Sequence, residues 1–114
     1  MRVLSGESLE NQFIIVLVTT ASKKEADSIA KGLLDAKLIA CANVLGPVSS
    51  HFHWSGKIET AEEFLLLMKS RTNLFIEVCQ KVKSLHSYEI PEILSLPIVG
   101  SSKEYADWLV SVLV

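Results

Sequence analysis

The feature that most constrains the fold is a hydrophobic period that switches along the chain between two and about 3.6 residues. It begins with Phe13–Val18, FIIVLV, an uninterrupted apolar run that is typical of a strand buried on both faces. From Ser22 to about Ala36 the apolar residues recur at helical spacing, and Glu25 follows Ser22 as in a capping box. The chain is therefore predicted to start with a central strand and a helix.

Two long extended segments come next. Leu38–Val44 is predicted to be a strand, and after a bulge or bend at Gly46–Pro47 a second extended piece runs over Val48–Trp54. A turn at Ser55–Gly56 leads into the long strand Lys57–Lys69. The pair should form an extended hairpin that projects beyond a small sheet.

A second helix and a fourth strand continue the alternation. Apolar residues at helical spacing from Phe75 to Leu85 predict a helix with Thr72 or Asn73 as its cap. Ile90–Val99 is then predicted to be the fourth strand. The order to this point is βαββαβ.

A last helix is predicted to start at Ser101 or Ser102, and its expected apolar face consists of Tyr105, Trp108, Leu109 and Val112. The predicted fold class is therefore α+β, a ferredoxin-like βαββαβ sandwich with a long hairpin between the second and third strands and an extra C-terminal helix.

Composition limits the number of domains and predicts an assembly. The 114 residues fit one domain, expected over residues 13–114 after a flexible N-terminal segment of residues 1–12. Hydrophobic residues make up 49% of the chain, and the charged fraction of 21% is below the roughly 25% of typical soluble domains. Because small domains have much surface for their volume, this surplus predicts that a strand or helix face is buried against another subunit.

Charge, apolar run length and cysteine usage limit the classes of partner and the cellular location that the sequence predicts. A net charge of −2 without a large Lys/Arg cluster provides no basic field, so no nucleic-acid partner is predicted. Apolar runs such as Phe64–Met68 are far too short to cross a bilayer and the N-terminus lacks a signal-peptide pattern, so no membrane association is predicted. Cys41 and Cys79 form no CxxC pair, which predicts reduced thiols and a cytoplasmic location.

One segment gathers chemically active side chains. Leu85–Ile93, LHSYEIPEI, places His86, Tyr88, Glu89 and Glu92 directly after an amphipathic run. One interpretation is structural: the imidazole complements the end of a helix and the acids form the polar face of a strand. The other is that the segment binds a cation or a polar ligand.

Several stretches resemble the CutA divalent-cation-tolerance family, from Phe13 to about Leu109. They are VTT at Val18–Thr20, LIACANV at Leu38–Val44, WSGKIE at Trp54–Glu59 with the later Lys69, and LHSYEIPEI followed by EYADWL at Glu104–Leu109. The resemblance implies a ferredoxin-like protomer in a homotrimer, with hairpin strands pairing between subunits and clefts where subunits meet. It also implies binding of divalent copper and other divalent cations.

The resemblance further implies a set of cleft residues: Cys41, Trp54, Lys69, His86, Tyr88 and Glu89. Cys41, Trp54, Lys69 and Tyr88 are expected to line a ligand cleft, with ordinary packing and surface roles as the alternative. His86 and Glu89 are the expected metal residues, because neutral imidazole suits copper and zinc and a carboxylate completes or orients such a site.

This chain departs from the family's pattern in ways that bear on the metal. Thr19 stands where some members carry a copper-associated cysteine, and Ser87 stands where a proline usually follows the histidine. The missing thiolate disfavours Cu(I), so Cu(II) or Zn(II) held by nitrogen and oxygen is predicted, with no organic cofactor. His51 and His53 are an addition of this chain; at i, i+2 in a strand they share a face, either as a metal-chelating pair or as an exposed pair without function.

Two functions fit these patterns. One is a homotrimeric, copper-type divalent-cation binding protein in metal tolerance or homeostasis; the other is a trimeric regulator or scaffold, similar to PII-like trimers, whose clefts bind a small molecule or an unidentified protein partner. No catalytic residue is predicted, because the chain lacks a nucleophile elbow, HExxH, a P-loop and a Gly-rich dinucleotide loop; a Cys41–His86 dyad is the one catalytic alternative. The run FLLLM lacks the paired aromatic residues and the basic residue with which RNA-recognition folds stack bases.

Overall fold

The computed structural model describes residues 2–3 and 12–114. Its elements are β1 (Arg2–Val3), β2 (Phe13–Thr20), α1 (Lys23–Asp35), β3 (Cys41–Trp54), β4 (Lys57–Arg71), the 3-10 turn η2 (Thr72–Leu74), α2 (Phe75–Leu85), β5 (Ile93–Pro97), β6 (Gly100–Ser101) and α3 (Lys103–Val112). The short strands β1 and β6 pair with each other. Most of the expected flexible segment, residues 1–12, lies outside the described residues.

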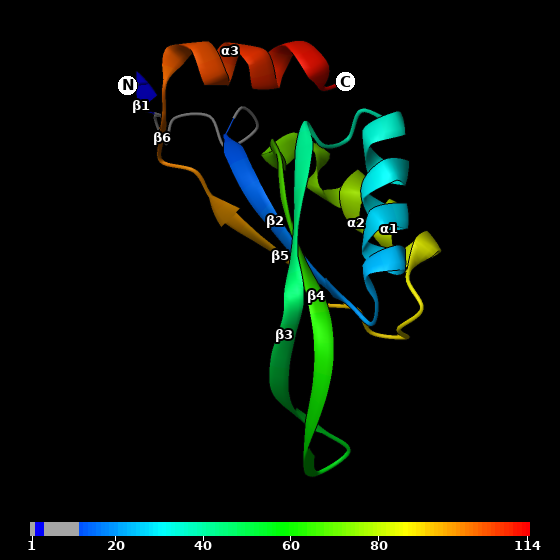
Figure 1. Cartoon of the computed structure of the whole chain (residues 1–114). Coiled ribbons are helices and arrows are strands. Elements are labelled where there is room, and N and C mark those ends of the chain that lie inside the picture. Colours follow the sequence, from blue (N-terminus) through cyan, green and yellow to red (C-terminus); the bar gives the residue numbers. More distant parts are fainter. Residues whose placement is uncertain (1, 4–11) are drawn as a thin grey trace.

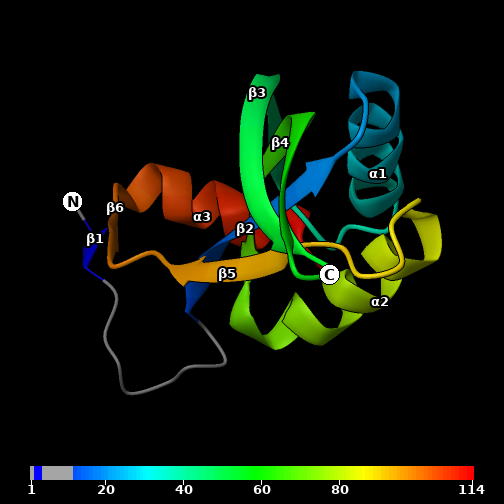
Figure 2. The same cartoon turned by 90° about the horizontal axis from the view of Figure 1, so that it is seen from below.

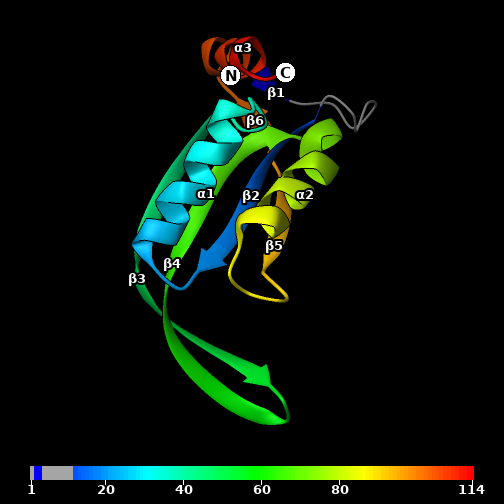
Figure 3. The same ribbon diagram turned by 90° about the vertical axis from the view of Figure 1, so that its right-hand side faces the viewer.

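The four main strands form one antiparallel sheet in the order β3-β4-β2-β5. Helices α1 and α2 lie on one face of this sheet (Figure 3), and α3 crosses the end farthest from the hairpin tip (Figure 1). Seen from below, α3 lies on the other side of the sheet from α1 and α2 (Figure 2). The predicted ferredoxin-like α+β fold with an additional C-terminal helix is confirmed.

Strand β2 is completely buried on only one face. Val16 and Val18 point to the helices and are fully buried, whereas Ile15 and Leu17 between them are half-buried. The expectation of burial on both faces is therefore wrong for the protomer, because α3 covers only one end of the second face. The helix-facing core is completed by Ile29, Leu33, Leu66, Met68, Val78 and Val82.

Strands β3 and β4 form the predicted long hairpin, whose far half extends beyond the sheet (Figure 1). The register shifts between Leu45 and Val48, so the bulge predicted at Gly46–Pro47 is confirmed. Gly46 has a φ of 152°, and a Cβ there would lie 2.6 Å from the ring of Phe64, so only glycine fits without a rearrangement. We call the part of the hairpin beyond this bulge, Val48–Glu63, the arm.

Two of the three main helices start as predicted. Ser22 and Ser102 are the N-caps of α1 and α3, each accepting a hydrogen bond from the backbone amide three residues later. Helix α2 differs: no described side chain caps it, and η2 leads into it. The expected caps Thr72 and Asn73 lie in η2, where the Thr72 hydroxyl donates to the carbonyl oxygen of Gln12 at 3.1 Å.

The fourth strand is shorter than predicted. Strand β5 covers Ile93–Pro97 rather than Ile90–Val99. Pro91 has no N–H for a strand ladder, and the backbone amides of Ser87 and Tyr88 donate to side chains rather than to a neighbouring strand. The segment 86–92 is therefore a loop packed against its neighbours.

The apolar face of α3 also differs from the prediction. Ala106 and Leu109 are buried, and Val112 is half-buried against the core. Tyr105 and Trp108, by contrast, keep 42% and 41% of their surface exposed. Ala106 and Leu109 therefore make the fully buried contacts of α3, whereas Tyr105 and Trp108 are only partly covered.

Candidate functional site

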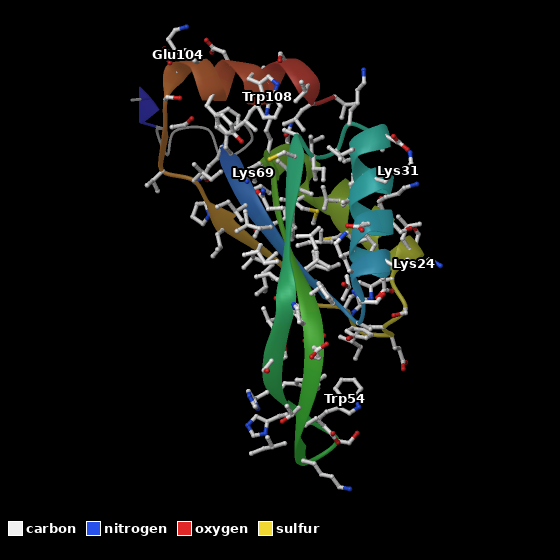
Figure 4. The ribbon with its side chains drawn as sticks, viewed as in Figure 1. Lys24, Lys31, Trp54, Lys69, Glu104 and Trp108 are labelled. Carbon is white, nitrogen blue, oxygen red and sulfur yellow. The ribbon has the colours of Figure 1, made fainter. Side chains whose placement is uncertain are left out.

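The predicted cleft residues lie at opposite ends of the hairpin. Cys41 and Lys69 are paired near α3, whereas Trp54 pairs with Lys57 beside the hairpin turn (Figure 4). At about 3.3 Å per residue, β4 spans roughly 40 Å from Lys57 to Lys69. Within one protomer these residues therefore do not form a single cleft.

At the α3 end, Cys41 and Lys69 each have a polar neighbour. The Lys69 Nζ donates to Asn43 Oδ1 at 2.6 Å, and the Cys41 Sγ lies 3.7 Å from Tyr105 Oη. Burial, and then the contact with Cys41, raise the pKa of Tyr105, so this phenol keeps its proton at neutral pH. The contacts join β3 to β4 and to α3.

The side chain of His86 is fully buried, and both of its ring nitrogens are in use. Nε2 lies 2.7 Å from the carbonyl oxygen of Thr19, and Nδ1 accepts a hydrogen bond from the amide of Tyr88 at 3.0 Å. Because a carbonyl only accepts, Nε2 carries the proton of the neutral ring. A metal at His86 would have to break one of these bonds, and the Cys41–His86 dyad is not formed in the described protomer.

Glu25 ties the loop 86–92 to the start of α1. Its Oε2 accepts the amide of Ser87 at 2.6 Å, its Oε1 accepts the amide of Ala21 at 3.3 Å, and Oε2 lies 3.9 Å from Nδ1 of His86. Burial alone would raise the pKa of Glu25, but these hydrogen bonds and the neighbouring imidazole bring it below its ordinary value. The sequence indicates the capping role of Glu25 but not this second one.

Replacing Glu25 with glutamine is expected to cost about 1–2 kcal/mol of stability at neutral pH, because hydrogen bonds to a charged acceptor become bonds to a neutral amide. A carboxyl whose pKa is lowered by folding stabilises the fold above its unfolded pKa, about 4.3, and this contribution is lost as the pH falls through the lower folded pKa. The difference in Tm between the two proteins should therefore shrink below about pH 4.

Thermal unfolding followed by circular dichroism across this pH range is the measurement. Asp27→Asn is the control, because it removes a half-exposed charge from the same helix, paired only with Lys23 in the described residues. If the difference in Tm between Glu25→Gln and the parent widens as the pH falls, the lowered pKa assigned to Glu25 is contradicted.

A cavity of about 670 Å³ lies between the arm and the loop 86–92. Figure 3 shows the arm curving beneath the end of the sheet, toward the chain that leads into β5. Four of the predicted site residues line this cavity: His51, Trp54, Tyr88 and Glu89. Its walls also include Phe52 and the carboxylates of Glu59, Glu63 and Glu92.

Glu63 is the buried acid of this cavity, with 6% of its surface exposed. Tyr88 Oη donates to Glu63 Oε2 at 2.8 Å. Burial and then this carboxylate raise the pKa of Tyr88 to about 12, so the phenol remains a donor at any physiological pH. Sequence analysis does not single out Glu63, because this residue follows Glu59 and Glu62 in a segment with the pattern of a solvated strand.

The histidines of the arm do not complete a metal site within one protomer. His51 and His53 are both exposed, and His51 Nδ1 lies 3.1 Å from Thr60 Oγ1. Within residues 2–3 and 12–114, no three His, Cys, Asp or Glu side chains are placed to hold one ion. Glu89 is also exposed and belongs to no such group of three in the described residues. The metal roles of His51, His53, His86 and Glu89 thus stay predictions.

The model of the CutA1 divalent ion tolerance protein family matches residues 14–112. The chain belongs to the CutA1 family. It is 46% identical to the divalent-cation tolerance protein CutA of Archaeoglobus fulgidus, over 82% of this chain and 91% of the relative. It is 41% identical to CutA of Thermus thermophilus, over 83% and 92% of the two chains. The crystal structure of rice CutA1 superposes with a TM-score of 0.88 at 34% identity, covering 94% of this chain and 98% of that one.

Membership of the CutA1 family confirms the predicted resemblance and corrects the predicted location. The cytoplasmic location predicted from cysteine usage is wrong as a general inference for this family. The solved A. fulgidus relative is named periplasmic and the rice relative chloroplastic. Cysteine usage does not distinguish between these compartments. Relatives are named for divalent-cation tolerance rather than for a reaction. In the described part of the chain, no helix has the length and apolar character needed to cross a membrane.

Proposed function

We propose that this protein is a homotrimer that binds divalent cations, Cu(II) or Zn(II), in metal tolerance or homeostasis. The main support for an assembly is the apolar character of the sheet face opposite α1 and α2. Cross-strand neighbours on β2, β4 and β5 make this face apolar, with Ile15, Leu17, Leu65, Leu67, Leu94 and Leu96. Leu94 and Leu96 keep 53% and 48% of their surface exposed, which favours burial against another copy.

The edges of the sheet support the same proposal. In the described part of the chain, β3 and β5 each lack a strand partner on their outer side. In the proposed trimer, the arm pairs with a neighbouring copy and covers these open edges. Trp54 of one copy can then approach Cys41 and Lys69 of the next. The number three rests on the resemblance to the CutA family.

Cation binding is supported by the family and by the exposed pair His51 and His53 on the arm. Imidazole nitrogens suit Cu(II) and Zn(II). Because the described residues of one protomer offer no three-ligand cluster, the proposed site draws ligands from more than one subunit. In this role the cation is the cargo of the protein.

A regulator or scaffold is the second candidate function. The cavity of about 670 Å³ favours it, because Phe52, Trp54 and Tyr88 give it the partly aromatic walls of a site for an organic ligand. Such a trimer would bind a small molecule or a segment of a partner protein, and metal would be incidental.

Native mass spectrometry during titration with Cu(II) and Zn(II) separates the two candidates, because it reads assembly and metal count together. We expect trimers that take up to three ions, and loss of those ions when His51 and His53 are both changed to alanine. His86→Ala is the comparison variant, since its imidazole is already hydrogen bonded. Loss of metal only in His86→Ala would move the site there, and a metal-free trimer would favour the second function.

A further inference from the structure

Glu63 is the only buried residue of the arm, all of which the structure describes. It lies at the root of the arm, directly after the bulge, where it pairs with Val48. The next residue, Phe64, is the last residue of β4 that pairs with β2, so from Glu63 to the turn the described hairpin has two strands only. A two-stranded ribbon is marginally stable by itself, and a bulge bends it. The direction of the arm therefore depends on contacts at its root.

Tyr88 provides such a contact from the loop 86–92. Its Oη donates to Glu63 Oε2 at 2.8 Å, and the charge of the acceptor strengthens this bond. The tyrosine is itself held in place, because its backbone amide donates to Nδ1 of His86 at 3.0 Å and the two ring centroids lie 4.8 Å apart. His86 donates in turn from Nε2 to the carbonyl oxygen of Thr19 in β2 at 2.7 Å. This series of contacts connects the end of the sheet to the root of the arm.

A small rotation at the root displaces the hairpin turn by a large distance. The seven residues from Val48 to Trp54 span about 23 Å at roughly 3.3 Å per residue, so a rotation of about 10° moves the turn by about 4 Å. This displacement is close to the spacing of neighbouring strands and exceeds what backbone hydrogen bonds tolerate. An arm without a fixed direction would have to be ordered during association, which weakens binding.

We propose that the Tyr88–Glu63 hydrogen bond fixes the direction of the arm in the protomer and thereby prepares the arm to pair with a neighbouring copy. Tyr88 is then a positioning residue, which acts on the arm through Glu63. The effect on association rests on the proposed trimer, whereas the direction of the arm can be measured within one chain.

Pulsed dipolar EPR spectroscopy measures the direction of the arm. Nitroxide labels are attached at two exposed positions, Ile58→Cys beside the hairpin turn and Lys24→Cys on α1, after the two natural cysteines, Cys41 and Cys79, are changed to serine. Labelled chains are diluted with unlabelled chains, so the measured distance joins two labels of the same chain in any state of assembly. The width of the distance distribution then reports how firmly the arm is held.

The variants are compared in chains in which Leu94 and Leu96 are also changed to glutamate, because this change is expected to separate the copies that would otherwise hold the arm. Tyr88→Phe removes the hydroxyl but keeps the ring beside His86, so the distance distribution should become about twice as wide. Ser87→Ala is the matched control: it removes a hydroxyl of the same loop that bonds to Glu25 rather than to the arm. Its distribution should keep the width of the parent distribution.

Association is measured by sedimentation across a dilution series, with Leu94 and Leu96 unchanged. Tyr88→Phe should raise the dissociation constant about tenfold and Ser87→Ala less than about twofold. Equal widths in Tyr88→Phe and the parent, or equal broadening in Ser87→Ala, would overturn the proposal. Broadening without weaker association would overturn the role in assembly. A parent protein that sediments as a protomer would contradict the trimer, and the distances would still decide whether Tyr88 positions the arm.

Discussion

Leu33→Ala is expected to lower the free energy of unfolding by about 2–5 kcal/mol. Leu33 lies on the face of α1 that packs against the sheet and has no exposed surface. Truncation to alanine removes its buried methyl groups and leaves a cavity between α1 and the sheet, and close-packed neighbours refill such a cavity only in part. The measurement is urea denaturation followed by circular dichroism at one fixed protein concentration, because association of the subunits adds to the apparent stability.

Leu34→Ala is the matched control for this prediction. Leu34 is the next residue of the same helix, and 42% of its surface is exposed. The same truncation should therefore cost no more than about 1 kcal/mol. Equal losses at the two positions would mean that α1 does not pack on the sheet through the face described above.

The double change of Leu94 and Leu96 to glutamate is expected to dissociate the assembly. Full burial of a leucine side chain contributes about 1.5–3 kcal/mol, and about half of each burial remains to be gained at Leu94 and Leu96, so the two together correspond to a factor of roughly 10 to 10² in association for each protomer. The introduced carboxylates add a desolvation cost to any interface that forms there. Sedimentation velocity at micromolar protein should show the mass falling to that of the protomer, with the circular dichroism of the helices retained.

Ile76→Glu is the control for the double change. Ile76 is even more exposed, at 72%, but it lies on α2, on the helical side of the sheet. Its substitution should leave the mass unchanged. An unaltered mass in the Leu94 and Leu96 variant, or equal dissociation in the control, would place the interface elsewhere.

The fold could be predicted because most of its determinants are local. The apolar periods of β2 and α1, the cap at Ser22 and the bulge at Gly46–Pro47 all depend on residues a few positions apart. The prediction was wrong where longer-range packing decides the outcome. Hydrophobic runs identify β2 as a strand, but they do not distinguish a face covered by helices from one left open in the protomer.

The candidate site was harder to predict, because its important contacts join distant parts of the chain. Glu25 meets Ser87 across 62 positions, and Tyr88 meets Glu63 across 25. The sequence shows that His86 is a possible ligand but not that main-chain groups already occupy both of its nitrogens. The predicted hairpin, by contrast, already placed Trp54 beside its turn and Lys69 at the far end of its second strand, as the structure has them.

The central claim is that the protomer is incomplete and that its open sheet face is buried in a homotrimer. Light scattering coupled to size-exclusion chromatography of the unmodified protein tests this most directly. The account predicts a single species of three times the protomer mass of 12.6 kDa, with a thermal midpoint that falls on dilution. A species of 12.6 kDa at micromolar concentration, with a midpoint independent of concentration, would contradict it.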